Sequence, residues 1–166
     1  KSSLKDPAAP IAVDFDPRRK VLLLVFSGLA GRLGVPLFEF NKLTSGMKKI
    51  NKIYLRDGQQ LWYHRGLPNI GDNIDGIATF LRQYTAHQST QRLVVIGNSA
   101  GGYAALLFGH LLQADEDHAF APKTFIDPIK RIIHRDTPRH ATPTWRQLFF
   151  YGQRKYFDLK PVLRQA

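Results

Sequence analysis

The chain has 166 residues, and its 24 Lys and Arg against 13 Asp and Glu give a formal net charge of +11. This length fits one domain with a buried core, and no apolar run approaches the roughly 20 residues that a membrane-spanning helix needs. The absence of cysteine excludes disulfides and thiolate metal sites. The compartment stays open, with a soluble protein of the cytoplasm favoured. Because the chain begins at Lys1 rather than Met, we expect a processed product or a piece of a longer protein.

The positive charge is concentrated toward the C-terminal end. Residues 123–166 hold ten Lys and Arg against three Asp, a net charge of +7. Such a surface can attract nucleic acid, anionic lipid or an acidic protein. The basic residues of this segment are scattered and no run exceeds two, so we expect a solvated or interface surface and no nucleic-acid partner.

The first third of the chain predicts three strands and one helix. Residues 1–19 contain three prolines and read as an extended lead-in, with a short edge strand at Ile11–Phe15. Lys20–Phe26 is an apolar run typical of a central strand buried on both faces. After a Gly-rich stretch, apolar residues at helical spacing predict a helix over Pro36–Ile50. Lys52–Leu55 is the next strand.

The rest of the chain continues this alternation. Asp72 is expected to cap a helix with an apolar face, and Leu93–Ile96 is expected to be a strand. A buried helix over Tyr103–Leu112 and a strand at His118–Ala121 follow. Beyond Pro122 the pattern weakens, and only a helix over Pro143–Phe150, with Thr142 as its cap, is expected. The order predicts an α/β fold with a mostly parallel sheet and helices on both faces, organised as a lead-in at 1–19, a core at 20–122 and a basic helical segment at 123–166 that is lid-like or forms an interface.

One motif carries chemistry. Gly97-Asn98-Ser99-Ala100-Gly101 matches the pattern G-x-S-x-G, directly after a predicted strand and before a buried helix. This pattern places a serine on a strained turn so that its hydroxyl projects clear of the sheet. Side chains at the two glycine positions would clash, because the turn brings strand and helix close together. A Gly-rich turn that binds phosphate is the alternative, but the Walker lysine and the dinucleotide spacing are both missing.

The residues LVVIGNSAGGYAALLFG resemble the nucleophile elbow and following helix of the α/β-hydrolase family, and VLLLVFSGLAG is similar to the family's earlier central strand and oxyanion loop. The resemblance covers roughly residues 20–122. It implies that Ser99 is the nucleophile of a serine esterase or lipase-like enzyme. It also implies that backbone amides stabilise the oxyanion, one from Ala100 and the second from Leu29 or Ala30.

The family pattern is not complete in this sequence. The acid and the histidine of the triad follow the serine on later loops, yet only 67 residues follow Ser99. Three explanations stay open: the sequence is truncated before the last strands, the acid is Asp127 and the base His134 or His140, or the fold persists without activity. The other histidines are expected to be structural or exposed; His64 lies among aromatic residues and precedes the serine.

Two functions therefore remain. The first is a serine hydrolase that acts on a small-molecule or polymer-linked ester, with an apolar wall drawn from four aromatic residues: Trp62, Tyr63, Phe125 and Trp145. The second is a non-catalytic binding or assembly module that uses the basic 123–166 surface. No cofactor and no metal site are expected, since no histidine pair has metal-ligand spacing. An open sheet edge predicts a partner chain or a homodimer.

Overall fold

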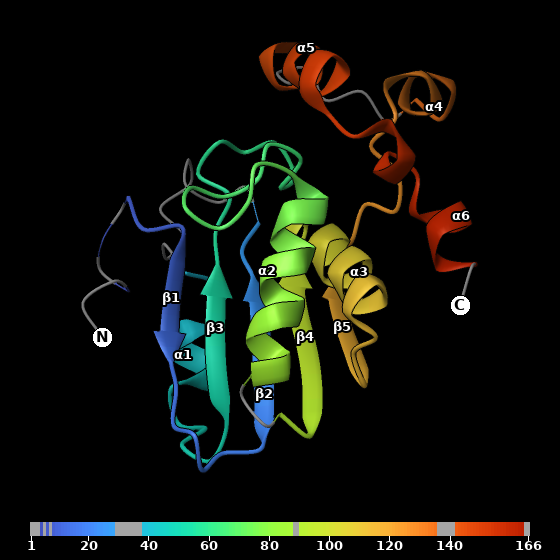
Figure 1. Ribbon diagram of the computed structural model, residues 1–166. Coiled ribbons are helices and arrows are strands. Elements are labelled where there is room, and N and C mark those ends of the chain that lie inside the picture. The colour runs from blue at the N-terminus through green and yellow to red at the C-terminus, as the bar shows by residue number, and fades with distance from the viewer. Residues whose placement is uncertain are drawn as a thin grey trace.

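The computed structural model describes residues 4, 6, 8–28, 38–87, 90–135 and 142–164. Five strands form one sheet in the order β1-β3-β2-β4-β5 (Figure 1). β2, β3, β4 and β5 pair in parallel, and β1 is antiparallel to β3 at one edge. The strands span Ile11–Asp14, Val21–Phe26, Asn51–Leu55, Arg92–Asn98 and Glu116–Phe120. The predicted mostly parallel sheet is confirmed.

Helices cover both faces of this sheet. The long helices α2 (Ile74–His87) and α3 (Ala100–Leu112) lie on one face, in front of the strands in Figure 1, and the short α1 (Asn41–Thr44) lies on the other. Three further helices follow β5, namely α4 (Pro128–Ile133), α5 (Thr142–Tyr151) and α6 (Leu159–Leu163), together with a 3₁₀ turn, η3 (Arg154–Tyr156). α4 and α5 lie past the end of the sheet toward which β3 points.

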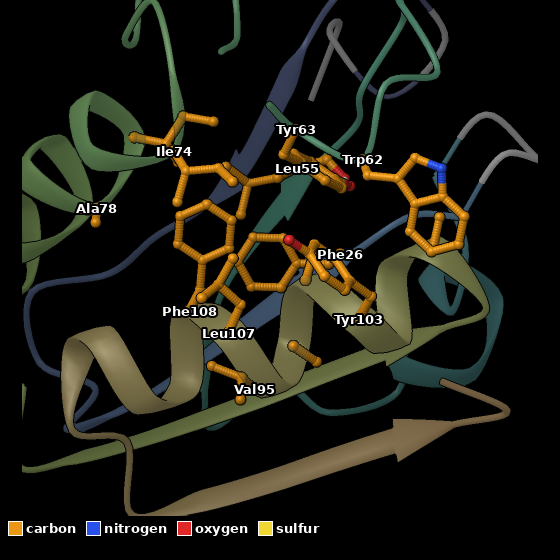
Figure 2. Close-up of a cluster of buried hydrophobic side chains, with 14 of the residues drawn as sticks. Phe26, Leu55, Trp62, Tyr63, Ile74, Ala78, Val95, Tyr103, Leu107 and Phe108 are labelled. Carbon is orange, nitrogen blue, oxygen red and sulfur yellow. The ribbon is translucent and has the colours of Figure 1, made fainter. Parts of the chain in front are cut away.

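β2 is buried on both faces, as its apolar sequence predicts, and its side chains divide between two clusters. Phe26 joins the larger cluster beneath α2 and α3, where its ring stacks on that of Phe108 with centroids 5.0 Å apart (Figure 2). Tyr63 packs edge-on against both rings. On the other face, Val25 joins a smaller cluster with Tyr54. Burial of these large side chains from three strands and two helices holds the end of β4 in place.

The C-terminal segment contributes to the same large cluster. Five of its side chains are buried there: Ile126, Leu148, Tyr156, Phe157 and Leu159. Backbone hydrogen bonds join its two halves, from Ile126 N–H to the Phe157 carbonyl and from Leu159 N–H to the Thr124 carbonyl. In the described part of the chain after β5, strand-like pairing is confined to an isolated bridge between Phe125 and Asp158.

Three local expectations were wrong. The helix expected over Pro36–Ile50 is only Asn41–Thr44 in the described part, because Phe40 has a left-handed backbone (φ 60°); its supposed apolar face is exposed at Leu43 and Met47. β5 begins two residues before the expected strand and ends before Ala121, whose φ is positive. The cap of α2 is Asn73 rather than Asp72: the Asn73 side chain accepts the Gly76 N–H.

Candidate active site

Ser99 lies on a sharp turn between β4 and α3. Its backbone has φ 57° and ψ −115°, a conformation that a non-glycine residue rarely adopts, and its side chain is exposed. The Ser99 N–H donates to the Phe120 carbonyl (2.9 Å), and the Ser99 carbonyl accepts from the Tyr103 N–H (3.1 Å). β5 on one side and the first turn of α3 on the other therefore hold the serine in this strained conformation.

The glycines of the motif allow the turn to close. A Cβ atom on Gly97 would lie 2.0 Å from the Gly101 carbonyl oxygen, and one on Gly101 would lie 2.1 Å from the Phe26 carbonyl oxygen. Real Cβ atoms do not approach backbone atoms so closely, so β2, β4 and α3 meet at distances that only glycine permits. This confirms the expected clash at the two glycine positions.

The expected oxyanion amides are only partly within the described structure. Ala100 is the first residue of α3 and is buried, so its N–H belongs to the first helical turn, which has no acceptor within the helix. Leu29 and Ala30 lie outside the described residues. Gly28, which precedes them, packs against the turn: a Cβ there would lie 2.8 Å from the Asn98 carbonyl oxygen and 3.6 Å from the Ser99 Cβ.

A buried carboxylate, Glu39, lies beside this turn. Its side chain accepts hydrogen bonds from the Gly28 N–H and the Asn98 side chain, and its own N–H donates to the Ser27 hydroxyl. Burial raises the pKa of Glu39, while the two hydrogen bonds act in the opposite direction. Sequence reasoning missed Glu39, although a single acidic residue between Phe38 and Phe40 could have indicated it.

Of the four aromatic residues expected to form an apolar wall, two lie in the core. Trp62 and Tyr63 are buried core residues. Phe125 packs against His134, and the Trp145 side chain lies outside the described structure. A different aromatic pair is joined to the turn through a backbone hydrogen bond. Phe120, whose carbonyl binds Ser99, is exposed, and its ring centroid is 5.9 Å from that of Phe40, the residue after Glu39.

Two of the three candidate acids and bases lie in the described structure, one at each end of α4. Asp127 caps α4, where its side chain accepts the Lys130 N–H (2.9 Å). His134 follows the other end of the same helix, with its ring centroid 5.2 Å from that of Phe125. His140 lies outside the described residues. None of the hydrogen bonds found among the described residues joins Asp127 or His134 to Ser99.

His64 is a structural residue. Its Nδ1 accepts the Gln153 N–H (3.0 Å), so Nε2 carries the proton and donates to the Tyr103 hydroxyl (3.0 Å). The Tyr103 hydroxyl in turn donates to the Tyr156 carbonyl (2.7 Å). Burial lowers the pKa of His64 to about 3, which keeps the ring neutral at physiological pH.

Neither a metal-binding cluster nor a membrane-spanning helix is present among the described residues. No group of three or more His, Asp or Glu side chains there could hold a metal ion. Within the same ranges, no helix has both the length and the apolar character that crossing a bilayer requires.

Comparison with known proteins gives structural neighbours only. No protein-family model matches the chain, and no curated protein sequence matches it. Among solved structures, the chain is similar to an α/β hydrolase enzyme from a metagenome of sediments of the lagoon of Mar Chica, Morocco (TM-score 0.48, 13% identity, 92% of this chain and 69% of that one). It is also similar to a lipase-esterase related protein from Clostridium acetobutylicum (TM-score 0.46, 16% identity, 93% of this chain and 74% of that one).

Proposed function

We propose that this protein is a serine hydrolase that cleaves an ester or a related acyl bond, with Ser99 as its nucleophile. The main support for this proposal is the backbone conformation of Ser99. An exposed serine is held at φ 57° and ψ −115° between a strand and a helix, in a turn that glycines allow to close. Strain of this kind persists in proteins where a function requires it.

The reaction follows from the surroundings of the hydroxyl. The Ser99 Oγ attacks the acyl carbon while a base takes its proton, and the carbonyl oxygen becomes an oxyanion. The N–H of Ala100 and a second amide, from Leu29 or Ala30, stabilise that charge. Loss of the alcohol gives an acyl-serine, and water then releases the acid and restores the hydroxyl.

The base must be a group other than His64, which is buried and already bonded at both ring nitrogens. Of the residues in this sequence, His134 and His140 with Asp127 are the candidates that the proposal retains. A base from a part of the protein that follows this sequence is the alternative. Ser99 is the nucleophile with either source of the base.

The substrate that fits this turn is an ester with an apolar acyl group, either as a small molecule or linked to a polymer. Phe120 is exposed and its carbonyl binds Ser99, and Phe40 lies beside it. Aromatic rings next to a reacting carbonyl bind hydrocarbon by removing it from water. We therefore expect butyryl esters to react faster than acetyl esters.

A fluorophosphonate probe tests the nucleophile. Incubation with the probe followed by intact-mass analysis should add one adduct to the wild-type chain, located at Ser99 by peptide mapping. Ser99→Ala should abolish the adduct, and Ser45→Ala, which changes an exposed serine remote from the motif in sequence, should leave it unchanged. An unlabelled wild-type chain, tested also as the longest natural form of the protein, would refute the proposal.

The second candidate function is an assembly module, favoured by the surface of α4 and α5. Large apolar side chains are exposed there among basic residues: Ile129, Ile132, Ile133, Phe149, Phe150 and Tyr151. α5 also bounds an open hollow of about 400 Å³ that Arg146 and Gln147 line. Exposed apolar groups of this kind mark interaction sites. In sedimentation velocity, Ile132→Glu should then abolish a self-association that Leu43→Glu, at another exposed apolar position, leaves intact.

A further inference from the structure

We infer that Glu39 is a positioning residue for the Ser99 turn, which it fixes by joining the end of β2 to the end of β4. This inference rests on the proposed function of Ser99. Glu39 itself lies in the turn that precedes α1 and is only 8% exposed.

The contacts of Glu39 reach both strands. Its carboxylate accepts the N–H of Gly28, two residues after β2, and the side chain of Asn98, the last residue of β4. Its N–H donates to the Ser27 hydroxyl (3.3 Å). A single residue thus contacts three residues near the serine: Ser27, Gly28 and Asn98.

The place where Glu39 joins the two strands explains why the contact is needed. β2 and β4 pair in parallel as far as Phe26 and Gly97. Beyond that pair, the Gly28 N–H has no place in the ladder and requires another acceptor because it is close to the buried turn. The Glu39 carboxylate serves as an acceptor for groups at both strand ends.

The Glu39 carboxylate and the Ser99 side chain lie on the same side of Gly28. An imagined Cβ on Gly28 would be 3.3 Å from the Glu39 Oε1 and 3.6 Å from the Ser99 Cβ. Glu39 therefore packs against the same face of Gly28 as Ser99 does.

The second carboxylate oxygen of Glu39 is buried at a cost in free energy. The Glu39 Oε2 is buried and has no hydrogen-bond partner among the described residues. Burying a carboxylate oxygen without a donor is costly, and native proteins keep few such groups.

Variants of Glu39 test the inference through the rate of Ser99 labelling. Misplacing a catalytic group by about 1 Å costs about 100-fold in rate, so Glu39→Ala should slow the second-order labelling rate 10- to 100-fold. Glu39→Gln keeps an acceptor oxygen and should recover most of that rate. With p-nitrophenyl butyrate, the loss in Glu39→Ala should fall on kcat, with KM within about twofold. Glu116→Ala, at a half-exposed carboxylate of β5, is the control.

Folding and reactivity are separated by two further measurements. All rates are taken at a temperature where circular dichroism shows each variant to be folded. Hydrogen exchange of the Gly28 amide should be faster in Glu39→Ala than in the wild type and unchanged in Glu116→Ala. Equal Gly28 exchange, or equal labelling of Glu39→Ala and wild type, overturns the positioning role. A wild type that does not label overturns the proposed function instead, and the exchange result then decides whether Glu39 joins the strands.

Discussion

Gly101 approaches the end of β2 more closely than any side chain would allow. A Cβ at this position would lie 2.1 Å from the Phe26 carbonyl oxygen and 2.8 Å from its carbonyl carbon. Because both atoms belong to the backbone of a central strand, a methyl group can be accommodated only if α3 moves away from the sheet. The position of Ser99 depends on this approach, since Ser99 is the N-cap residue of the same helix.

Gly101→Ala should therefore destabilise the protein by more than about 1 kcal/mol and slow labelling of Ser99. Urea denaturation and the fluorophosphonate rate measure the two effects. Gly46→Ala is the matched control, because its Cβ would meet no atom within 4 Å and its φ is not positive; its stability should change by less than about 0.5 kcal/mol. Equal stability of the two variants would contradict the steric argument.

At the scale of elements, His64 connects the loop after β3 to η3. The ring bonds the Gln153 N–H and the Tyr103 hydroxyl, and neighbouring residues reinforce the contact. The Gln153 side chain accepts the Ile74 N–H and donates to Asp75, and Lys155 pairs with Asp75 (2.8 Å). The start of α2, the loop and η3 are thereby joined by polar contacts above the apolar core.

This link predicts a pH dependence of stability. The folded-state pKa of His64, about 3, lies below its ordinary value of 6.5. Between these values the unfolded chain binds a proton that the folded chain does not, so stability falls as pH falls from about 6.5 toward 3. The slope from this residue is about 1.4 kcal/mol per pH unit. Above pH 6.5, His64 is neutral in both the folded and the unfolded state, so the free energy of unfolding no longer depends on its protonation.

Urea denaturation between pH 7 and pH 4 measures this slope. His64→Gln should be less stable at pH 7, because two buried hydrogen bonds are disturbed, and its stability should fall less steeply with acid. His118→Gln, at an exposed histidine, should keep the wild-type slope. If the free energy of unfolding of His64→Gln changed with pH as steeply as that of the wild type, His64 would be shown to take up a proton in the folded state as well.

At the scale of the whole molecule, the C-terminal segment and the sheet share one core. Leu159 in α6 is fully buried in the large cluster that also contains Phe26 of β2 and Phe108 of α3. α3 contacts α6 directly. We therefore expect the C-terminal segment and the sheet to unfold in one transition, rather than the segment detaching first.

Leu159→Ala should lower the midpoint of this single transition by the equivalent of about 2–5 kcal/mol. Tryptophan fluorescence and far-ultraviolet circular dichroism should report the same midpoint. Ile129→Ala, at a side chain 66% exposed, should change stability by less than about 0.5 kcal/mol. Two separate transitions, with the sheet unaffected by Leu159→Ala, would show that the segment folds independently.

The sequence by itself determined the strands and the turn. Val21–Phe26 and Leu93–Ile96 are continuous apolar runs, and such runs form central strands wherever the rest of the chain covers them. The turn at Ser99 was predictable because the need for glycine at 97 and 101 is a local steric requirement. The helix over Pro36–Ile50 was wrong because its apolar spacing did not reveal the left-handed backbone of Phe40, nor that Leu43 and Met47 would stay exposed.

Only the tertiary structure decided what surrounds the serine. Glu39 contacts Gly28 and Asn98, and Phe40 contacts Phe120, so each pair joins residues that are remote in the chain. Their proximity arises because the parallel strands β2, β4 and β5 end at the same edge of the sheet. A sequence pattern reports the periodicity of one element, whereas the register between elements depends on packing across the whole core.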